Sequence, residues 1–307
     1  MGKYRYYCSG NIMTDQVMQP DGTLSDVHLG GPSVFAYAGV KLYDDNCCIL
    51  ANAGLDFDEI YGDWIRANNV DTSQIWRMVE HTHASVLVYH EDGSYEPGRP
   101  HSPLNFGLCE SNGKRFGLAC DENSVLYYPH DTFNWASWLN IWEAMEQKHF
   151  KFMWEIHANS CIPEQLDRII KVLPTVDMFS INYNEMKTLL GSSTTEEEAI
   201  RWLQKYFGKF CILRVGSRGL YAIEADKATL IPSINSEIAV DSTGCGNCST
   251  GAAMYGWMET GDAIMAGIMA NIAAGYNVRQ YGPYPKFTEK DREDSFRLAA
   301  ELRKNYD

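Results

Sequence analysis

The sequence predicts an α/β fold in which helices cover both faces of a mostly parallel sheet. Strand-like and helix-like segments alternate regularly from residue 151 to residue 231. This alternation builds parallel sheets, because each helix carries the chain back to the start of the next strand. Hydrophobic residues make up 45% of the 307 residues, enough to fill one large core. We therefore expect a three-layer α/β/α sandwich.

Three short apolar segments predict buried strands in the second half of the chain: residues 151–159, 175–182 and 209–216. Residues 163–173, between the first two, carry apolar side chains at helical spacing, and Pro163 suits a first helical turn. The pattern predicts two strands joined by a helix, followed by a third strand in the same sheet.

Specific residues mark helix ends and turns in this region. The helix that starts at Tyr183 should end at Gly191, since glycine commonly terminates helices. Residues 220–233 indicate a hairpin that turns near Asp226. The helix that follows Gly191 begins with two overlapping Thr-x-x-Glu capping signals, which are Thr194 with Glu197 and Thr195 with Glu198.

The first half of the chain is less regular and predicts a small additional sheet. Residues 24–31 have the composition of a strand. Residues 85–97 alternate between apolar and polar side chains and contain Asp92-Gly93, a strong hairpin signal. Two separate β-rich pieces fit a small sheet that packs against the main body.

Strand–helix order resumes over residues 31–70, and no linker rich in Pro, Gly or Ser divides the chain. We therefore expect a single domain over residues 1–307. The small sheet should be an insertion, a β lid formed from about 10–30 and 80–105.

Composition excludes some classes of partner. The formal net charge of −14 argues against non-specific binding to nucleic acid or to an anionic membrane. No run of about 18 apolar residues predicts a membrane span, and the N-terminal residues lack the apolar core of a signal peptide. The 9 cysteines lie in apolar surroundings, typical of reduced core residues, so we expect a cytoplasmic protein.

One loop carries the strongest chemical signal, the segment "VDSTGCGNCSTGAAMYGWMETGD" over residues 240–262. Thr243 to Gly246 have little side-chain bulk, and a helix should begin near Gly246 or Asn247. The first N–H groups of a helix lack intrahelical partners and sit at the positive end of its dipole. The loop is therefore either an anion cradle or an ordinary glycine-rich helix start.

Cys245 and Cys248 form a Cys-x-x-Cys pair at this helix start, a position that favours reactive thiols. A redox role is therefore a competing hypothesis. With 9 cysteines such a spacing arises easily by chance, and the pair lies late in the chain rather than after an early strand. We favour two incidental thiols.

Seven segments spread along the chain form an ordered set of motifs. They are "SGNIMTD", "LGGPSVFAYAGVKL", "NAGLDFDEIYGDW", "NYNE", "RVGSRGLY", "DSTGCGNCSTGA" and "MANIAAGYNV". Together they resemble the ribokinase-like, or PfkB, family of sugar and nucleoside kinases, in the family's order and over most of the chain. The resemblance implies a ribokinase-like sandwich with a mostly parallel central sheet and a small β-sheet lid.

The resemblance also implies roles for matched residues. Sugar-binding positions are Asp15, Gly30 and Gly31. Nucleotide positions are Asn182, Glu185, Gly216, Gly219 and Asn271, of which Glu185 would also hold Mg²⁺ through water. The anion hole would consist of Gly244, Cys245 and Gly246, beside the catalytic position at Asn247. Asp241 and Thr243 stand where the family often helps to hold a monovalent cation such as K⁺.

Three residues depart from the family pattern. Asn247 stands where a family Asp takes the proton from the sugar hydroxyl, and a neutral amide cannot accept that proton. General base catalysis is typically worth about 10²–10⁴-fold in rate. Phe35 replaces a sugar-binding Asn, and Arg214 replaces a Thr of the nucleotide strand.

Asn247 leaves three explanations open: another group serves as base, the chain binds without phosphorylating, or the Asn was introduced to trap a complex. The resemblance implies ATP-dependent phosphorylation of a sugar or sugar-derivative hydroxyl with Mg²⁺, impaired by Asn247. The alternative is a catalytically inactive sugar- or nucleotide-binding protein on the same fold. We also expect a small-molecule partner and a homodimer through the lid sheet.

Overall fold

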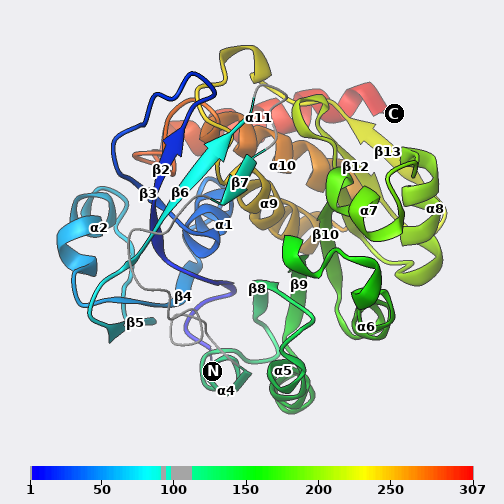
Figure 1. Ribbon diagram of the computed structural model, residues 1–307, viewed down its shortest axis with the longest axis horizontal. Helices are drawn as coiled ribbons and strands as arrows, with labels where there is room; N and C mark the ends of the chain where they lie inside the picture. The colour runs from blue at the N-terminus through cyan, green and yellow to red at the C-terminus, as the bar shows by residue number, and fades with distance from the viewer. Residues whose placement is uncertain (1, 91–94, 98–112, 307) are drawn as a thin grey trace.

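The computed structural model describes residues 2–90, 95–97 and 113–306 (Figure 1). These residues form a large sheet flanked by helices and a second, smaller sheet. The strands of the large sheet are β1 (Tyr6–Ser9), β4 (Cys47–Gly54), β5 (Ile75–Val79), β8 (Val125–His130), β9 (Lys151–Ile156), β10 (Met178–Asn182), β11 (Cys211–Arg214), β12 (Leu220–Ile223) and β13 (Ala228–Ile231).

The described strands of the large sheet follow the order β13-β12-β11-β10-β9-β8-β1-β4-β5. All pairs from β11 to β5 are parallel, whereas β12 pairs antiparallel with both β11 and β13. The predicted hairpin over residues 220–233 is confirmed as β12 and β13. The expectation of a mostly parallel central sheet is also confirmed.

Helices cover both faces, which confirms the three-layer prediction. One face packs against α1 (Pro32–Lys41), α2 (Phe57–Ala67), α9 (Cys245–Thr260), α10 (Ala263–Asn277) and α11 (Glu289–Arg303). The other packs against α4 (Gly113–Ala119), α5 (Trp135–Lys148), α6 (Leu166–Val172), α7 (Tyr183–Leu190) and α8 (Glu196–Tyr206). In Figure 1 the blue N-terminal part lies on one side and the green-to-yellow middle on the other, with α9 and α10 between them.

The second sheet consists of β2 (Met13–Met18), β3 (His28–Gly30), β6 (His83–Tyr89) and β7 (Tyr95–Pro97), in the order β3-β2-β6-β7. β2 and β6 are parallel, and the outer strands are antiparallel to them. The strand predicted over 24–31 begins only at His28. The predicted turn at Asp92-Gly93 and the lid range beyond residue 97 lie outside the described residues.

Local signals predicted helix ends well and the continuity of one helix less well. Gly191 ends α7, and Thr195 with Glu198 forms a complete capping box on α8. The helix predicted over 163–173 is α-helical only in α6, with 3₁₀ turns over Pro163–Gln165 and Leu173–Thr175. The second turn contains Pro174, which cannot donate a helical hydrogen bond. Among the described helices, none is both long and apolar enough to span a membrane.

Side-chain alternation decides which polar residues face α9. Met153 and Ile212 belong to the core on the α9 side of the sheet, and so does Tyr127. Residues two apart on a strand point to the same face. Glu155 and Arg214, at the carboxyl ends of β9 and β11, therefore lie on the same face as Tyr127, directed at α9.

Candidate active site at the N-terminus of α9

Residues 244–247, called the cradle here, lead into a helix start, as their glycines predict. α9 begins at Cys245, and its N-cap, Gly244, has φ = 75°, a left-handed conformation that favours glycine. The Phe35 ring fills the space beside it, since a Cβ added at Gly244 would lie 2.2 Å from that ring. The Cys248 N–H makes a helical bond to the Gly244 carbonyl. The preceding N–H groups, those of Gly246 and Asn247, therefore have no intrahelical acceptor.

Cys245 corrects one part of the predicted anion hole. Its backbone N–H donates to the Ser242 carbonyl at 3.1 Å, so the turn before the helix already uses this donor. Both thiols of the Cys-x-x-Cys pair contact carbonyls of α10, Cys245 at Ala274 and Cys248 at Ala273. Burial raises the pKa of Cys245 to about 12 and also raises the pKa of Cys248 well above its ordinary value, which opposes a redox role.

Asp241 and Thr243 are joined in a tight turn ahead of the helix. The Thr243 N–H and hydroxyl both donate to Asp241 Oδ1, at 3.0 Å and 2.8 Å. Burial raises the pKa of Asp241. The Tyr89 hydroxyl of β6 lies 3.1 Å from Thr243 Oγ1 and 3.2 Å from Ser242 Oγ. The second sheet therefore contacts the loop directly.

Asp15 lies on β2 of the second sheet, close enough to the loop for the charge of Asp241 to act on it. The Ser85 hydroxyl donates to Asp15 Oδ1 at 2.6 Å. Gly30 makes room for the carboxylate, since a Cβ there would lie 1.9 Å from Asp15 Oδ2. Gly31 follows as the N-cap of α1. Burial raises the pKa of Asp15 to about 6, and the charge of Asp241 adds to the shift.

Asn182 and Glu185 form a capping box at the start of α7. The Glu185 N–H donates to Asn182 Oδ1 at 2.8 Å, and the Asn182 N–H donates to Glu185 Oε2 at 2.8 Å. Burial raises the pKa of Glu185 to about 7, although the nearby charge of Arg214 opposes the shift. The box holds a buried carboxyl group at the carboxyl end of β10, where α/β proteins bind ligands.

Arg214 lies between this carboxyl group and the cradle. Its Nη1 is 2.9 Å from Glu155 Oε1, and its Nη2 is 3.9 Å from Glu185 Oε2. The Arg214 and Glu155 side chains are only 14% and 6% exposed. A Cβ added at Gly246 would lie 1.9 Å from Arg214 Nη1, so the guanidinium packs against the first turn of α9. Gly216 and Gly219 flank the turn that follows β11.

Asn247 is bonded to the sheet beneath it. Its Nδ2 donates to the Tyr127 hydroxyl at 3.0 Å, and that hydroxyl donates to Glu155 Oε2 at 2.8 Å. Burial raises the pKa of Tyr127 far above its ordinary value, and the charge of Glu155 raises it further. The Tyr127 phenol is therefore neutral at physiological pH and bridges Asn247 to Glu155.

Sequence reasoning missed Tyr127 and Glu155 as site residues and treated Arg214 only as a departure. A signal for two of them was present, because Glu155 and Arg214 are charged residues near the ends of apolar strands. Charged side chains in such positions are rarely buried without a partner. Tyr127 gave no signal, since one tyrosine among aromatic neighbours resembles an ordinary core residue.

Asn271, predicted near a nucleotide base, is 5% exposed and uses its amide on backbone. Its Nδ2 donates to the carbonyls of Ile231 and Pro232, at 2.8 Å and 2.9 Å. These bonds fasten the segment after β13 to α10. Contact with a nucleotide stays a prediction for this residue.

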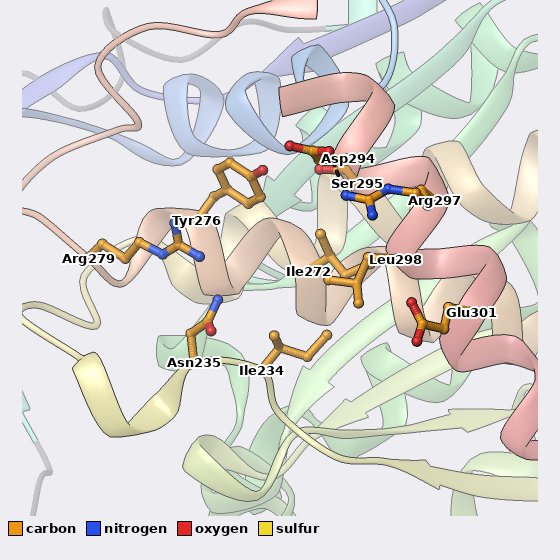
Figure 2. Close-up of a pocket in the computed structure, with 10 residues that line it drawn as sticks. All are labelled: Ile234, Asn235, Ile272, Tyr276, Arg279, Asp294, Ser295, Arg297, Leu298 and Glu301. Carbon is orange, nitrogen blue, oxygen red and sulfur yellow. Dashed lines mark hydrogen bonds and ion pairs between the residues drawn. The ribbon is translucent and has the colours of Figure 1, made fainter. Parts of the chain in front are cut away.

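A cavity of about 230 Å³ lies elsewhere, between α10 and α11 (Figure 2). Ile272 and Leu298 line it together with charged side chains such as Arg279 and Glu301. The predicted site residues do not line this cavity. Over the described ranges, no group of three or more His, Cys, Asp or Glu side chains is placed to hold a metal ion.

Comparisons with known proteins bear on the family and the fold. The chain is 28% identical over 325 residues to the "uncharacterized protein C16C9.01c" of Schizosaccharomyces pombe, a match that covers 90% of this chain and 85% of that protein. The family model "pfkB family carbohydrate kinase" matches residues 116–291.

Three solved structures have a similar fold at low identity. A probable sugar kinase from Rhizobium etli superposes with a TM-score of 0.73 at 16% identity, covering 98% of this chain and 100% of that one. Adenosine kinase from Sinorhizobium meliloti gives 0.72 at 16% identity, covering 99% of each chain. An Escherichia coli protein described as a ribokinase II, in complex with ATP and Mg²⁺, gives 0.71 at 20%, covering 96% and 99%. Because the family model spans more than half of the sequence, the chain belongs to the pfkB family of carbohydrate kinases.

Proposed function

We propose that the chain binds ATP and a sugar at the N-terminus of α9 and transfers the γ-phosphoryl group to a sugar hydroxyl. One observation carries the proposal. The first turn of α9 offers the N–H groups of Gly246 and Asn247 without intrahelical acceptors, and Arg214 lies against that turn. Backbone donors and a guanidinium in one place suit the charge of a transferring phosphoryl group.

Asp15 would hold the sugar. Its buried carboxylate accepts a hydrogen bond from Ser85 and packs closely against Gly30, which has no side chain to displace it. Carboxylates that accept hydrogen bonds from sugar hydroxyl groups fix the orientation of the sugar. The contacts of Tyr89 with Ser242 and Thr243 would close the second sheet, acting as a lid, over the loop.

The proposed reaction is an in-line transfer. The sugar hydroxyl oxygen forms a bond to the γ-phosphorus, the bond between that phosphorus and the oxygen of the β-phosphate breaks, and ADP leaves. The hydroxyl proton passes to a phosphoryl oxygen or to solvent, because the Asn247 amide cannot accept it. The N–H groups of Gly244, Gly246 and Asn247 would bind the charge that develops on the transferring group.

Glu185 fits a role at a hydrated Mg²⁺. Its Oε1 accepts no hydrogen bond from a described residue, and burial raises its pKa because the Arg214 guanidinium, 3.9 Å away, offsets only part of the cost. Carboxylates commonly hold Mg²⁺ through its water shell, and the bound ion would neutralise phosphate charge. The side-chain oxygens of Asp241 and Thr243 would hold a K⁺ ion. The residues that would border the nucleotide are Asn182, Gly216, Gly219 and Asn271.

Structural neighbours support these ligands. The Escherichia coli ribokinase II was solved with ATP and Mg²⁺. Aminoimidazole riboside kinase from Salmonella enterica was solved with its riboside and an ATP analogue, and it superposes on 96% of this chain with a TM-score of 0.70. We extend ATP, Mg²⁺ and a sugar or nucleoside substrate to this chain on that basis.

The test is sugar-dependent release of ADP. The protein is incubated with ATP, Mg²⁺ and K⁺ against hexoses, pentoses, ketose derivatives and nucleosides, beside an Asp15→Asn variant. We expect ADP formation that depends on one of these classes and is lost in the variant. No sugar-dependent ADP from the unchanged chain, with ATP and sugar still bound, would support the second candidate instead.

That second candidate is a binding protein without phosphoryl transfer, and the bonded amide at Asn247 favours it. Both candidates use the same ligands and the same single domain over residues 1–307. A cytoplasmic location and a homodimer through the lid sheet are further proposals. Light scattering of the protein, with and without charged substitutions on β3, an outer strand of the lid sheet, tests the dimer.

A further inference from the structure

We propose that Glu155, acting through Tyr127, fixes the orientation of the Asn247 amide, so that residue 247 offers a ligand a hydrogen-bond acceptor and not a base. The hydrogen-bonded chain runs from Asn247 Nδ2 to the Tyr127 hydroxyl and on to Glu155 Oε2. Glu155 and Tyr127 are positioning residues in this assignment. The identity of the ligand hydroxyl rests on the proposed function, whereas the orientation of the amide does not.

The number of available protons fixes the direction of the hydrogen bonds between Asn247, Tyr127 and Glu155. A phenol has one proton to donate, and an ionised carboxylate can only accept. Glu155 is paired with Arg214 at 2.9 Å, so the Tyr127 proton goes to Glu155. The Tyr127 oxygen can then only accept from residue 247, and an amide supplies the required N–H.

The same count shows why aspartate does not fit this position as the site stands. An ionised aspartate at position 247 and Glu155 would both need the single Tyr127 proton, and one carboxylate would face the phenol oxygen without a donor. Buried carboxylates that share one site repel each other, and the fold then disfavours ionisation of one of them. Residue 247 and residue 155 are therefore matched to each other.

One polar atom of the Asn247 amide, Oδ1, remains for a ligand. Asn247 is partly exposed, and its Oδ1 bonds to no described residue. Since Nδ2 is committed to Tyr127, Oδ1 faces a ligand as an acceptor. A ligand hydroxyl bound there keeps its proton, so the site orients the hydroxyl without activating it.

Titratable and charged groups from neighbouring elements surround the hydrogen bonds between Asn247, Tyr127 and Glu155. Glu155 comes from β9, Arg214 from β11 and Glu185 from α7, and His157, directly after β9, interacts electrostatically with Glu155. Arg214 Nη1 contacts Glu155 Oε1, whereas Tyr127 uses Oε2. A glutamine at position 155 could therefore accept from Arg214 with its oxygen and donate to Tyr127 with its nitrogen.

A charge-conserving swap tests the proposal. Asn247→Asp combined with Glu155→Gln keeps the net charge and reverses the direction of both hydrogen bonds. The amide at position 155 then donates to Tyr127, and Tyr127 donates to the carboxylate at position 247. We compare the unchanged protein, both single variants and the double variant by thermal unfolding at pH 5 and pH 8. Each single variant should lower Tm at pH 8 by at least about 3 °C, whereas the double variant should recover most of that loss.

A purely structural role of Asn247 predicts a different result. If the two losses add in the double variant, residues 155 and 247 are not matched and the proposal fails. Asn247→Asp alone should also be relatively less destabilised at pH 5, where one carboxyl group can take up a proton; equal loss at both pH values contradicts the proposal. These readouts need no turnover, so they stand even if the proposed kinase activity is absent.

Discussion

Replacing Arg214 by methionine should destabilise the protein far more than removing an exposed arginine. Arg214 pairs with Glu155 at 2.9 Å, with both side chains nearly buried. The change leaves Glu155 and Glu185 as carboxylates without their cation. Removing one partner of a buried ion pair typically costs about 3–5 kcal/mol, because the other charge stays desolvated. The methionine retains the apolar stem, so the loss should come mainly from the charge.

Arg201→Met is the matched control. Arg201 pairs with Glu197 one turn away on α8, but their side chains are 59% and 79% exposed. Exposed pairs at this spacing contribute about 0.3–0.5 kcal/mol. Both variants are unfolded with urea at pH 8 and at pH 5. Removing Arg214 should raise the pKa of Glu185 further, so part of the Arg214→Met loss should disappear at pH 5.

The result that would refute this reasoning is specific. If Arg214→Met costs within about 1 kcal/mol of Arg201→Met at pH 8, the guanidinium does not hold the two buried carboxylates together. A double variant, Arg214→Met with Glu155→Gln, should recover much of the single loss. No recovery would show that the cost comes from packing and not from the unpaired charge.

Three other predictions follow from buried titratable groups. Burial raises the pKa of Glu185 to about 7 from its ordinary 4.5, so stability is lost as pH rises between these values. Glu185→Gln should therefore raise the free energy of unfolding in urea at pH 8 by up to about 3 kcal/mol and weaken Mg²⁺-dependent ATP binding; an unchanged urea midpoint contradicts this. Burial also raises the pKa of Asp15 to about 6 from 3.8, so Asp15→Asn should gain stability at pH 8 and not at pH 3.5, a gain that circular dichroism melts would measure. Burial lowers the pKa of His130 to about 4, and neither ring nitrogen bonds to a described residue, so stability is lost as pH falls from about 6.5 to 4. His130→Phe should keep the stacking on Tyr128 and flatten that acid loss; equal acid sensitivity of both proteins would count against it.

Local patterns predicted most of the fold. Alternating strands and helices after residue 151 indicated the parallel sheet, and Gly191 and Thr195 marked helix ends that the structure confirms. These features depend on neighbouring residues along the chain. The shortened strand at His28 was not predicted, because its length depends on pairing with β2 and not on its own composition.

The site was predictable in part for the same reason. Gly244 and Gly246 were identified from their small size and from the resemblance of the loop to the family, and the turn and the close approach of Arg214 do need small residues there. The contact between Tyr127 and Asn247 joins residues 120 apart in sequence, and no local pattern predicts it. The sequence shows that Glu155 and Arg214 are charged residues near strand ends. It does not predict that they form a pair, because pairing depends on the order of the strands in the sheet.

The central claim is that this site transfers a phosphoryl group to a sugar in spite of Asn247. A single-turnover measurement tests it most directly, with protein in excess over ATP labelled in its γ-phosphate and each sugar class added in turn. Slow transfer without a base would escape a steady-state assay, and this design detects it. The account predicts labelled sugar phosphate from one class, lost in Asp15→Asn. Bound ATP that keeps its label, with no sugar phosphate from any class, would contradict it.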